Sequence, residues 1–175
     1  PASRKVRVLR VTPTAAERRM HLALAEYARA GWRDQAAGHS HADARLAMAV
    51  LCKRASSGAA ALGVSLGRRL RWLLMAPAEV AAQLSLPLDG EDAAGDEEPA
   101  GVLATPGLGD RADECRQVRQ LLALSREAVA SESKTAALDR LLRRAAEPAV
   151  VFTEYRDTAR LLASDTRTSV YRIRE

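Results

Sequence analysis

The sequence predicts a mainly α-helical bundle of about six helices with one short βα unit toward its C-terminal end. Hydrophobic residues make up 47% of the 175 residues, but aromatic residues make up only 3%. A core of this size must therefore be built from Leu, Val and Ala, a composition that favours close-packed helices. Apolar residues recur at three- and four-residue steps along most of the chain, as in amphipathic helices. One short run, Ala149 to Phe152, is apolar throughout and indicates a buried strand.

The N-terminal residues predict a strand followed by a helix. Apolar and basic residues alternate over residues 4–12, as they do in a strand with one packed face, and Pro13 ends the run. Thr14 and Glu17 form a capping-box pattern, in which each side chain accepts a hydrogen bond from a free amide of the first turn. We therefore expect a helix from about Thr14 to Gly31. Its core-facing stripe is Ala16, Met20, Leu24 and Tyr27.

Two more helices are predicted before residue 84. Ser40 and Asp43 give a start signal for the first, which is apolar almost all round over residues 46–52 and is expected to be buried. The second follows Gly58 and is interrupted by Pro77. It is expected to turn leucines inward and most of its arginines outward. The leucines are Leu62, Leu66, Leu70 and Leu73, and the arginines are Arg68, Arg69 and Arg71.

Residues 85–110 are rich in Pro, Gly, Asp and Glu and have little apolar periodicity, which predicts an acidic flexible linker. The linker separates residues 1–84 from residues 111–175. In the second part, helical spacing predicts one helix through Val118 to Val129 and another through Leu138 to Ala145. The apolar strand follows, and Thr153 is expected to cap a sixth helix that runs to about Ala163.

The formal net charge of +5 is unevenly distributed, because residues 1–80 carry 14 basic and 5 acidic side chains. A basic segment suits a polyanion such as DNA, although solvated helix faces and a genome that favours arginine would give the same composition. Cys52 and Cys115 are far apart and form no disulfide pattern, which favours a reduced, cytoplasmic setting. Arginines interrupt every apolar run before the ~18 residues that a membrane span needs, so no membrane partner is expected.

The sequence contains no recognisable pattern for a catalytic, cofactor-binding or metal-binding site. None of the three lysines lies in a phosphate-binding loop, and the acidic run Asp113-Glu114 lies in an amphipathic helix, where a helicase acidic box would follow a strand. His39, His41 and Cys52 lack a fourth zinc ligand. The segment from Thr153 to Asp157 is a better candidate site, because a helix that follows a buried strand points its free amides toward ligands. A plain capped helix remains the alternative there.

Three segments together resemble Swi-Snf-type superfamily two DNA helicases and translocases. Ser133-Lys134 and the run from Phe152 to Thr158 resemble the start of the second RecA-like lobe. Residues 4–17 are similar to the crossing from the first lobe. Leu51-Cys52-Lys53-Arg54-Ala55-Ser56-Ser57 and the helix after it resemble the Lys-Arg-Ala-x-Ser-Ser helical insertion of bacterial members, which include RNA-polymerase-recycling and phage-defence translocases. The resemblance covers most of residues 1–83 and 131–163.

The resemblance implies a fragment of an ATP-dependent motor that uses ATP and Mg²⁺. The nucleotide-binding loop would precede Pro1 and the arginine motif would follow Glu175, so the fragment itself is expected to be inactive. Its implied role is to brace the motor lobes and to contact duplex DNA without reading its sequence. The implied DNA-contacting residues are Arg68, Arg69, Lys134, Thr153, Tyr155 and Arg156.

Two further possibilities stay open. The chain can instead be a helical protein-interaction module that does not bind nucleic acid, since the leucine stripes suit a protein partner as well as a core. The predicted strand over residues 149–152 would also leave unpaired edges, which favour a homodimer of the fragment.

Overall fold

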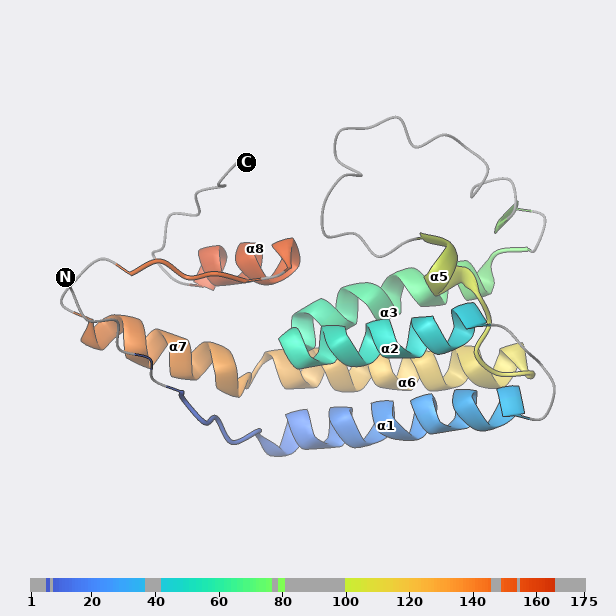
Figure 1. Ribbon diagram of the computed structural model, residues 1–175, viewed down its shortest axis with the longest axis horizontal. Coiled ribbons are helices and arrows are strands. Elements are labelled where there is room, and N and C mark those ends of the chain that lie inside the picture. The colour runs from blue at the N-terminus through green and yellow to red at the C-terminus, as the bar shows by residue number, and fades with distance from the viewer. Residues whose placement is uncertain are drawn as a thin grey trace.

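The computed structural model describes residues 6, 8–36, 42–76, 79–80, 100–145, 149–153 and 155–165. Six helices of ten or more residues and one short helix make up this part (Figure 1). The helices are α1 (Ala15–Ala36), α2 (Ala42–Ser57), α3 (Ala59–Leu74), α5 (Ala100–Ala104), α6 (Arg111–Val129), α7 (Ser133–Arg144) and α8 (Arg156–Asp165). The prediction of a mainly helical fold is confirmed.

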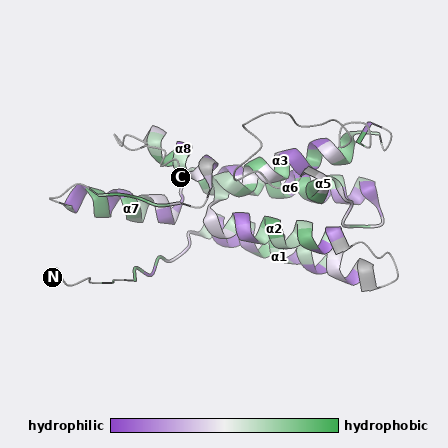
Figure 2. Cartoon of the chain, turned by 45° about the horizontal axis from the view of Figure 1, so that its top comes forward, coloured by the Kyte–Doolittle hydropathy of each residue, from purple (hydrophilic) through white to green (hydrophobic). Residues whose placement is uncertain are grey.

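Helices α1, α2, α3 and α6 form a four-helix bundle. Helix α1 packs against α2 and α6, and α3 packs against the same two helices, so the order around the bundle is α1, α2, α3, α6. Successive helices run in opposite directions (Figure 1). Helix α5 covers α2 and α3, and α8 contacts α3. Figure 2 shows α7 extending beyond the bundle with hydrophobic and hydrophilic residues alternating along it, and none of its residues is buried.

The bundle core is built from the stripes that the sequence predicts. On α1, Ala16, Met20, Leu24 and Tyr27 are all buried. Facing them are buried residues of the other helices: Met48 and Leu51 of α2, Leu62, Leu66 and Leu73 of α3, and Val118 and Leu121 of α6. The capping box at the start of α1 is also confirmed. The Thr14 amide donates to Glu17 Oε2 at 2.6 Å, and the Glu17 amide donates to Thr14 Oγ1 at 3.2 Å.

A single residue, Gly58, reverses the chain between α2 and α3. A Cβ atom at this position would lie 2.5 Å from Glu132 Oε1. That oxygen accepts a hydrogen bond from the Ala59 amide at 2.7 Å, so the Glu132 carboxylate satisfies a free donor at the start of α3. The glycine therefore leaves room for the carboxylate of Glu132, which lies between α6 and α7.

The predicted βα unit is wrong. Residues 149–153 form no strand, and the side chains of Val150 and Phe152 are 76% and 80% exposed. An extended segment becomes a strand only when a neighbour pairs with its amides and carbonyls, and no strand occurs in the described part of the chain. Helix α8 accordingly begins at Arg156, and Thr153 lies before it.

The strand predicted over residues 4–12 is not present in the described residues of that range, which are 6 and 8–12. Val6, Val8 and Leu9 are exposed, and no strand in the described part of the chain pairs with this segment. Residues 1–5 and 7 lie outside the described residues.

The predicted acidic linker differs from the structure at its C-terminal end. Residues 81–99 lie outside the described part, but residues 100–110 form α5 and a loop that packs on the bundle. Val102, Leu103 and Gly107 are buried there. A few apolar residues and one buried carboxylate, described below, are enough to anchor this segment, although its Pro and Gly content is typical of a linker.

Candidate nucleic-acid interface

The end of α2 and the start of α8 meet around the Arg54 side chain, which is 1% exposed. Its Nη2 atom lies 2.5 Å from Asp157 Oδ2, and its Nε donates to Ser65 Oγ at 2.9 Å. The guanidinium carbon lies 4.3 Å from the centre of the Tyr155 ring, within cation–π distance. Ser57 Oγ and Thr158 Oγ1 are 3.0 Å apart. We call these residues, Arg54, Ser57, Tyr155, Asp157 and Thr158, the Arg54 cluster.

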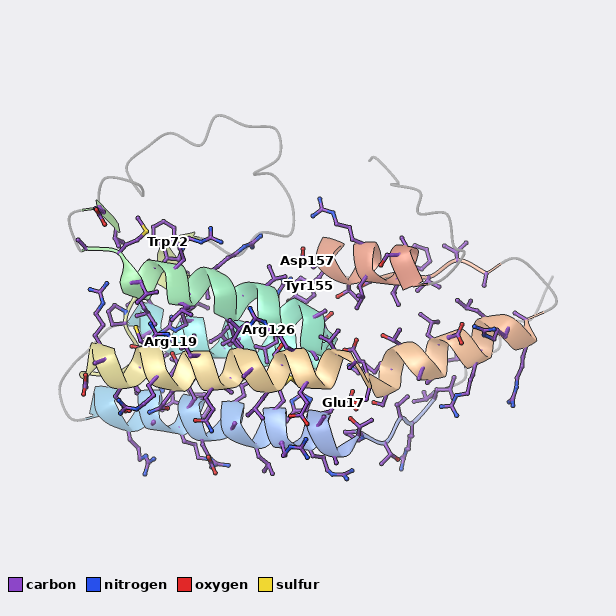
Figure 3. The ribbon with its side chains drawn as sticks, turned by 180° about the vertical axis from the view of Figure 1, so that it is seen from behind. Glu17, Trp72, Arg119, Arg126, Tyr155 and Asp157 are labelled. Atoms are coloured by element: carbon purple, nitrogen blue, oxygen red, sulfur yellow. The ribbon has the colours of Figure 1, made fainter. Side chains whose placement is uncertain are left out.

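The Arg54 cluster joins segments that are far apart in the sequence, since Arg54 and Asp157 are separated by 103 positions. Figure 3 shows Tyr155 and Asp157 at the end of α8 that approaches the bundle. A third segment reaches the same place: Lys134, at the start of α7, donates to the carbonyl oxygen of Ser56. Lys53 lies 5.9 Å from the Tyr155 ring. Cationic side chains from α2 and α7 are therefore gathered beside α8.

The structure brings only some of the predicted DNA-contacting residues together. Lys134 is exposed and Tyr155 is half-buried, and both lie at the end of α2. Thr153 is exposed in the segment that leads to α8. Arg156 is the first residue of α8, and its side chain lies outside the described part. Arg68 is half-buried on a different surface, between α3 and α6.

The prediction that Arg69 points outward is wrong, because its side chain is completely buried. Its Nη2 atom lies 2.5 Å from Glu114 Oε1, and its Nε donates to the Tyr27 hydroxyl at 2.7 Å. The Tyr27 hydroxyl in turn donates to Glu114 Oε1 at 2.6 Å. We call these three residues the Arg69 network. In this conformation Arg69 cannot reach a phosphate on a bound DNA.

Backbone groups of the segment after α5 complete the Arg69 network. Arg69 donates to the carbonyl oxygens of Leu103 and Thr105, both at 3.1 Å. The Glu114 carboxylate accepts from the amides of Gly107 and Leu108, at 2.9 and 3.1 Å to Oε2. A buried ion pair is stable when further hydrogen bonds satisfy its remaining donors and acceptors. These bonds therefore explain why residues 100–110 are held against the bundle.

The pKa values of two members of the network follow from this environment. Burial raises the pKa of the Tyr27 hydroxyl, and the nearby Arg69 charge only partly offsets it, so the tyrosine stays protonated. Burial alone would lower the pKa of Arg69, but the interactions with Tyr27 and Glu114 outweigh it and raise the pKa. The arginine is therefore permanently charged, as its pairing with a buried carboxylate requires.

A groove of about 640 Å³ lies between α3 and α6 on the outside of the bundle. We call it the α3–α6 groove. Small and apolar residues form its floor: Ala60, Gly63, Val64, Gly67, Leu122 and Val129. Three arginines border it: Arg68, Arg71 and Arg126. Arg119 lines the adjoining hollow at the end of α3, and Figure 3 shows Arg119 and Arg126 along α6. Of these arginines, the sequence prediction included only Arg68 as a site residue.

The sequence contains a signal for this groove. Helix α3 carries three arginines and no acidic residue, and Arg119 and Arg126 are seven positions apart, a spacing that places them on one face of α6. The two observations concern separate helices about 50 positions apart in the sequence. Only the packing of α3 on α6 brings the two sets of arginines to the same groove.

A larger cleft of about 1170 Å³ lies between residues 9–14, α7 and α8. Its lining carries both signs of charge, since Arg10 and Arg140 face a lining that also contains Asp139 and Glu132. It is therefore less suited than the α3–α6 groove to a uniformly negative ligand.

The zinc candidates from the sequence, His39, His41 and Cys52, form no site in the described part of the chain. His39 and His41 lie outside the described residues, and no group of three or more potential metal ligands occurs within them. Cys52 is half-buried and its pKa is raised by burial. In the described part of the chain no helix has the length and apolar character needed to cross a membrane.

Comparison of the chain with protein-family models, with curated proteins and with solved structures found no match.

Proposed function

We propose that this chain is the helical insertion and the start of the second lobe of a Swi-Snf-type DNA translocase. In this role it braces the motor lobes and contacts the DNA backbone without reading sequence. The observation that carries the proposal is the Arg54 cluster. Its members come from residues 54–57 and 155–158, which lie in the segments that resemble the insertion and the second lobe of that family.

A brace must transmit force between the parts that it joins, and the contacts of the Arg54 cluster suit that task. Arg54 is held from two sides, by Ser65 of α3 and by Asp157 of α8. Because a buried guanidinium is costly to leave unpaired, movement of α8 away from the bundle is opposed. The buried core and the Arg69 network hold the helices of the bundle together. ATP and Mg²⁺ belong to the rest of the motor in this proposal.

The exposed basic side chains favour DNA as the partner. Lys134 at the Arg54 cluster and Arg71, Arg119 and Arg126 near the α3–α6 groove are all exposed. Arginine and lysine bind duplex DNA by displacing condensed counterions, a contribution that depends on phosphate and not on base sequence.

The experiment is a fluorescence anisotropy titration of the whole chain with two duplexes of equal length and unrelated sequence. We expect equal affinities for the two, with log K falling linearly as log[NaCl] rises. A fluorescent neutral polymer titrated with the chain in place of the duplex is the control for nonspecific adsorption. Absence of binding at low salt, or strong preference for one duplex, would contradict the DNA-contacting part of the proposal.

A specific observation favours the second candidate, a helical protein-interaction module. Val8, Leu9, Val150 and Phe152 are between 64% and 85% exposed, and Leu141 of α7 is 50% exposed. A contiguous patch of exposed apolar side chains marks a site of protein–protein contact, and these side chains are the ones that such a contact would use. A chain that ignores DNA at low salt, but whose self-association in sedimentation velocity is abolished by Phe152→Ser, would support this candidate over the DNA-binding one.

A further inference from the structure

The described residues that line the α3–α6 groove carry positive charge and no negative charge. Among the residues that line it, Arg68, Arg71 and Arg126 are basic and none is acidic. The acidic residues of α6 are engaged elsewhere. Glu127 pairs with Arg19 of α1, and Asp113 pairs with Arg116 on its own helix, while Glu114 is buried in the Arg69 network. The described lining of this groove is therefore basic, which suits a negatively charged ligand.

The arginines extend too far for a single phosphate. Arg68 and Arg71 are three residues apart on α3, and Arg119 and Arg126 are seven residues apart on α6. At 1.5 Å per residue, these spacings correspond to about 4.5 and about 10 Å along the helix axes. A row of about 10 Å matches about three successive phosphates of one strand, since each strand of a duplex carries one charge per ~3.4 Å of the axis.

Two glycines of α3, Gly63 and Gly67, leave part of the groove floor without side chains. Gly63 allows α3 to approach α6 closely, because a Cβ atom there would lie 2.9 Å from Ser125 Oγ. One turn further, a Cβ atom at Gly67 would meet no atom within 4 Å, so this glycine faces open space in the groove. Glycine in the middle of a helix is destabilising, and its use here leaves α3 backbone open to close approach by a ligand.

We infer that the α3–α6 groove is the surface along which the sugar-phosphate backbone of duplex DNA lies, with Arg68, Arg71, Arg119 and Arg126 contacting phosphates and Gly67 admitting the backbone. The inference rests on the proposed function and assigns its DNA contact to one face of the bundle. That face is separate from the Arg54 cluster, where Lys134 and Tyr155 lie. It also replaces Arg69, which is buried, by Arg71 and the two arginines of α6.

The test uses the whole chain and a fluorescent duplex of mixed sequence at a series of NaCl concentrations. Arg71→Glu/Arg126→Glu changes two exposed residues of the groove. Arg29→Glu/Arg45→Glu, on the exposed faces of α1 and α2, changes the net charge equally. The groove variant is expected to bind at least about tenfold more weakly and to lower the slope of log K against log[NaCl] by about two units, one for each lost phosphate contact. The control variant should retain the slope of the unmodified chain.

A second variant, Gly67→Leu, tests the groove without changing charge. It fills the open space above α3, so DNA affinity should fall while a thermal melt shows that the bundle remains folded. Unchanged DNA binding in both groove variants would overturn the inference and leave the proposed function standing. Failure of the unmodified chain to bind DNA would overturn both. An acidic amphipathic peptide is a further probe. If Gly67→Leu weakened binding of the peptide but left binding of DNA unchanged, the groove would be assigned to a protein helix and the inference would be overturned as well.

Discussion

Arg69 Nη2 lies 2.5 Å from Glu114 Oε1, and both side chains are completely excluded from solvent. The two residues are 45 positions apart and come from α3 and α6, the helices between which the α3–α6 groove lies. One arginine of α3 thus faces the core, while Arg68 and Arg71 face the groove. The buried pair fixes the rotation of α3 about its own axis, and this rotation determines which arginines reach the surface.

Removing the charge of Glu114 is therefore expected to destabilise the whole bundle. Glu114→Gln leaves Arg69 charged in a buried site with no carboxylate, a change that costs about 3 kcal/mol or more in the free energy of unfolding. Urea denaturation followed by circular dichroism measures it. The double variant Arg69→Met/Glu114→Leu, which removes both charges, should recover only part of that loss, because it leaves the Leu103 and Thr105 carbonyls and the Gly107 and Leu108 amides without these partners. Arg71→Met, at an exposed position of the same helix, should change stability by no more than about 0.5 kcal/mol. Equal stabilities of Glu114→Gln and Arg71→Met would show that the pair does not hold the fold.

Glu17 is predicted to make the stability of the bundle depend on pH. Its carboxylate accepts from the Thr14 amide at 2.6 Å and from the amide and hydroxyl of Ser133 at 3.1 and 2.9 Å. One side chain thus satisfies free donors at the starts of both α1 and α7. Burial acts to raise the pKa of Glu17, but these hydrogen bonds together outweigh burial and lower the pKa.

Because the pKa of Glu17 is lower in the folded protein than in the unfolded chain, its contribution is fully present above the unfolded value of about 4.3. It is lost as pH falls through the lower folded value. Glu17→Ala should cost about 1 to 2 kcal/mol near neutral pH and should flatten the fall in stability below about pH 4. Urea titrations at several pH values measure this. Glu26→Ala, at an exposed position of the same helix, is the matched control. A Glu17→Ala profile parallel to that of the unmodified chain would exclude the two-helix cap.

Local patterns predicted the helices well, whereas contacts between distant segments were not predictable. The α1 stripe and its capping box depend on residues three or four positions apart, so the sequence contains all of their determinants. The burial of Arg69 depends on Tyr27 and Glu114, which are 42 and 45 positions away. Even so, Arg69 lies three residues after Leu66 and four before Leu73, which is helical spacing for a core position.

The site was less predictable than the fold for the same physical reason. Residues 149–153 are apolar enough for a strand, but a strand also needs a partner with which to form backbone hydrogen bonds. A local sequence pattern does not show whether such a partner is present. The Arg54 cluster requires α8 to pack beside the end of α2. The resemblance pointed to both segments, and the local pattern of Thr153 to Asp157 pointed to one of them, but neither predicted that the two segments are in contact.

Substitution by alanine is predicted to change the stability of the bundle in opposite directions at Gly58 and Gly67. Gly58→Ala would place a Cβ atom 2.5 Å from Glu132 Oε1 and displace the carboxylate that caps α3. We expect a loss of about 1 kcal/mol or more. Gly67→Ala places its Cβ in open space within a helix, so stability should rise by about 0.5 to 1 kcal/mol. Thermal melts of the two variants, measured side by side, test both expectations. A loss of stability in Gly67→Ala would mean that the groove floor is filled in the folded chain.

Asp157→Asn is predicted to release α8 while leaving the four-helix bundle folded. The substitution keeps the shape of the side chain but removes the charge that pairs with Arg54, which is almost completely buried. Amide hydrogen exchange measures the outcome helix by helix: amides of α8 should lose protection, and amides of α3 and α6 should keep it. Asp139→Asn is the matched control, because Asp139 pairs with Arg143 on the exposed surface of α7, where an ion pair contributes little. If α8 remained as protected in Asp157→Asn as in the control, its other contacts, which include the Tyr155 ring and the Ser57–Thr158 hydrogen bond, would be enough to hold it. The charge pair would then have no part in bracing the two segments.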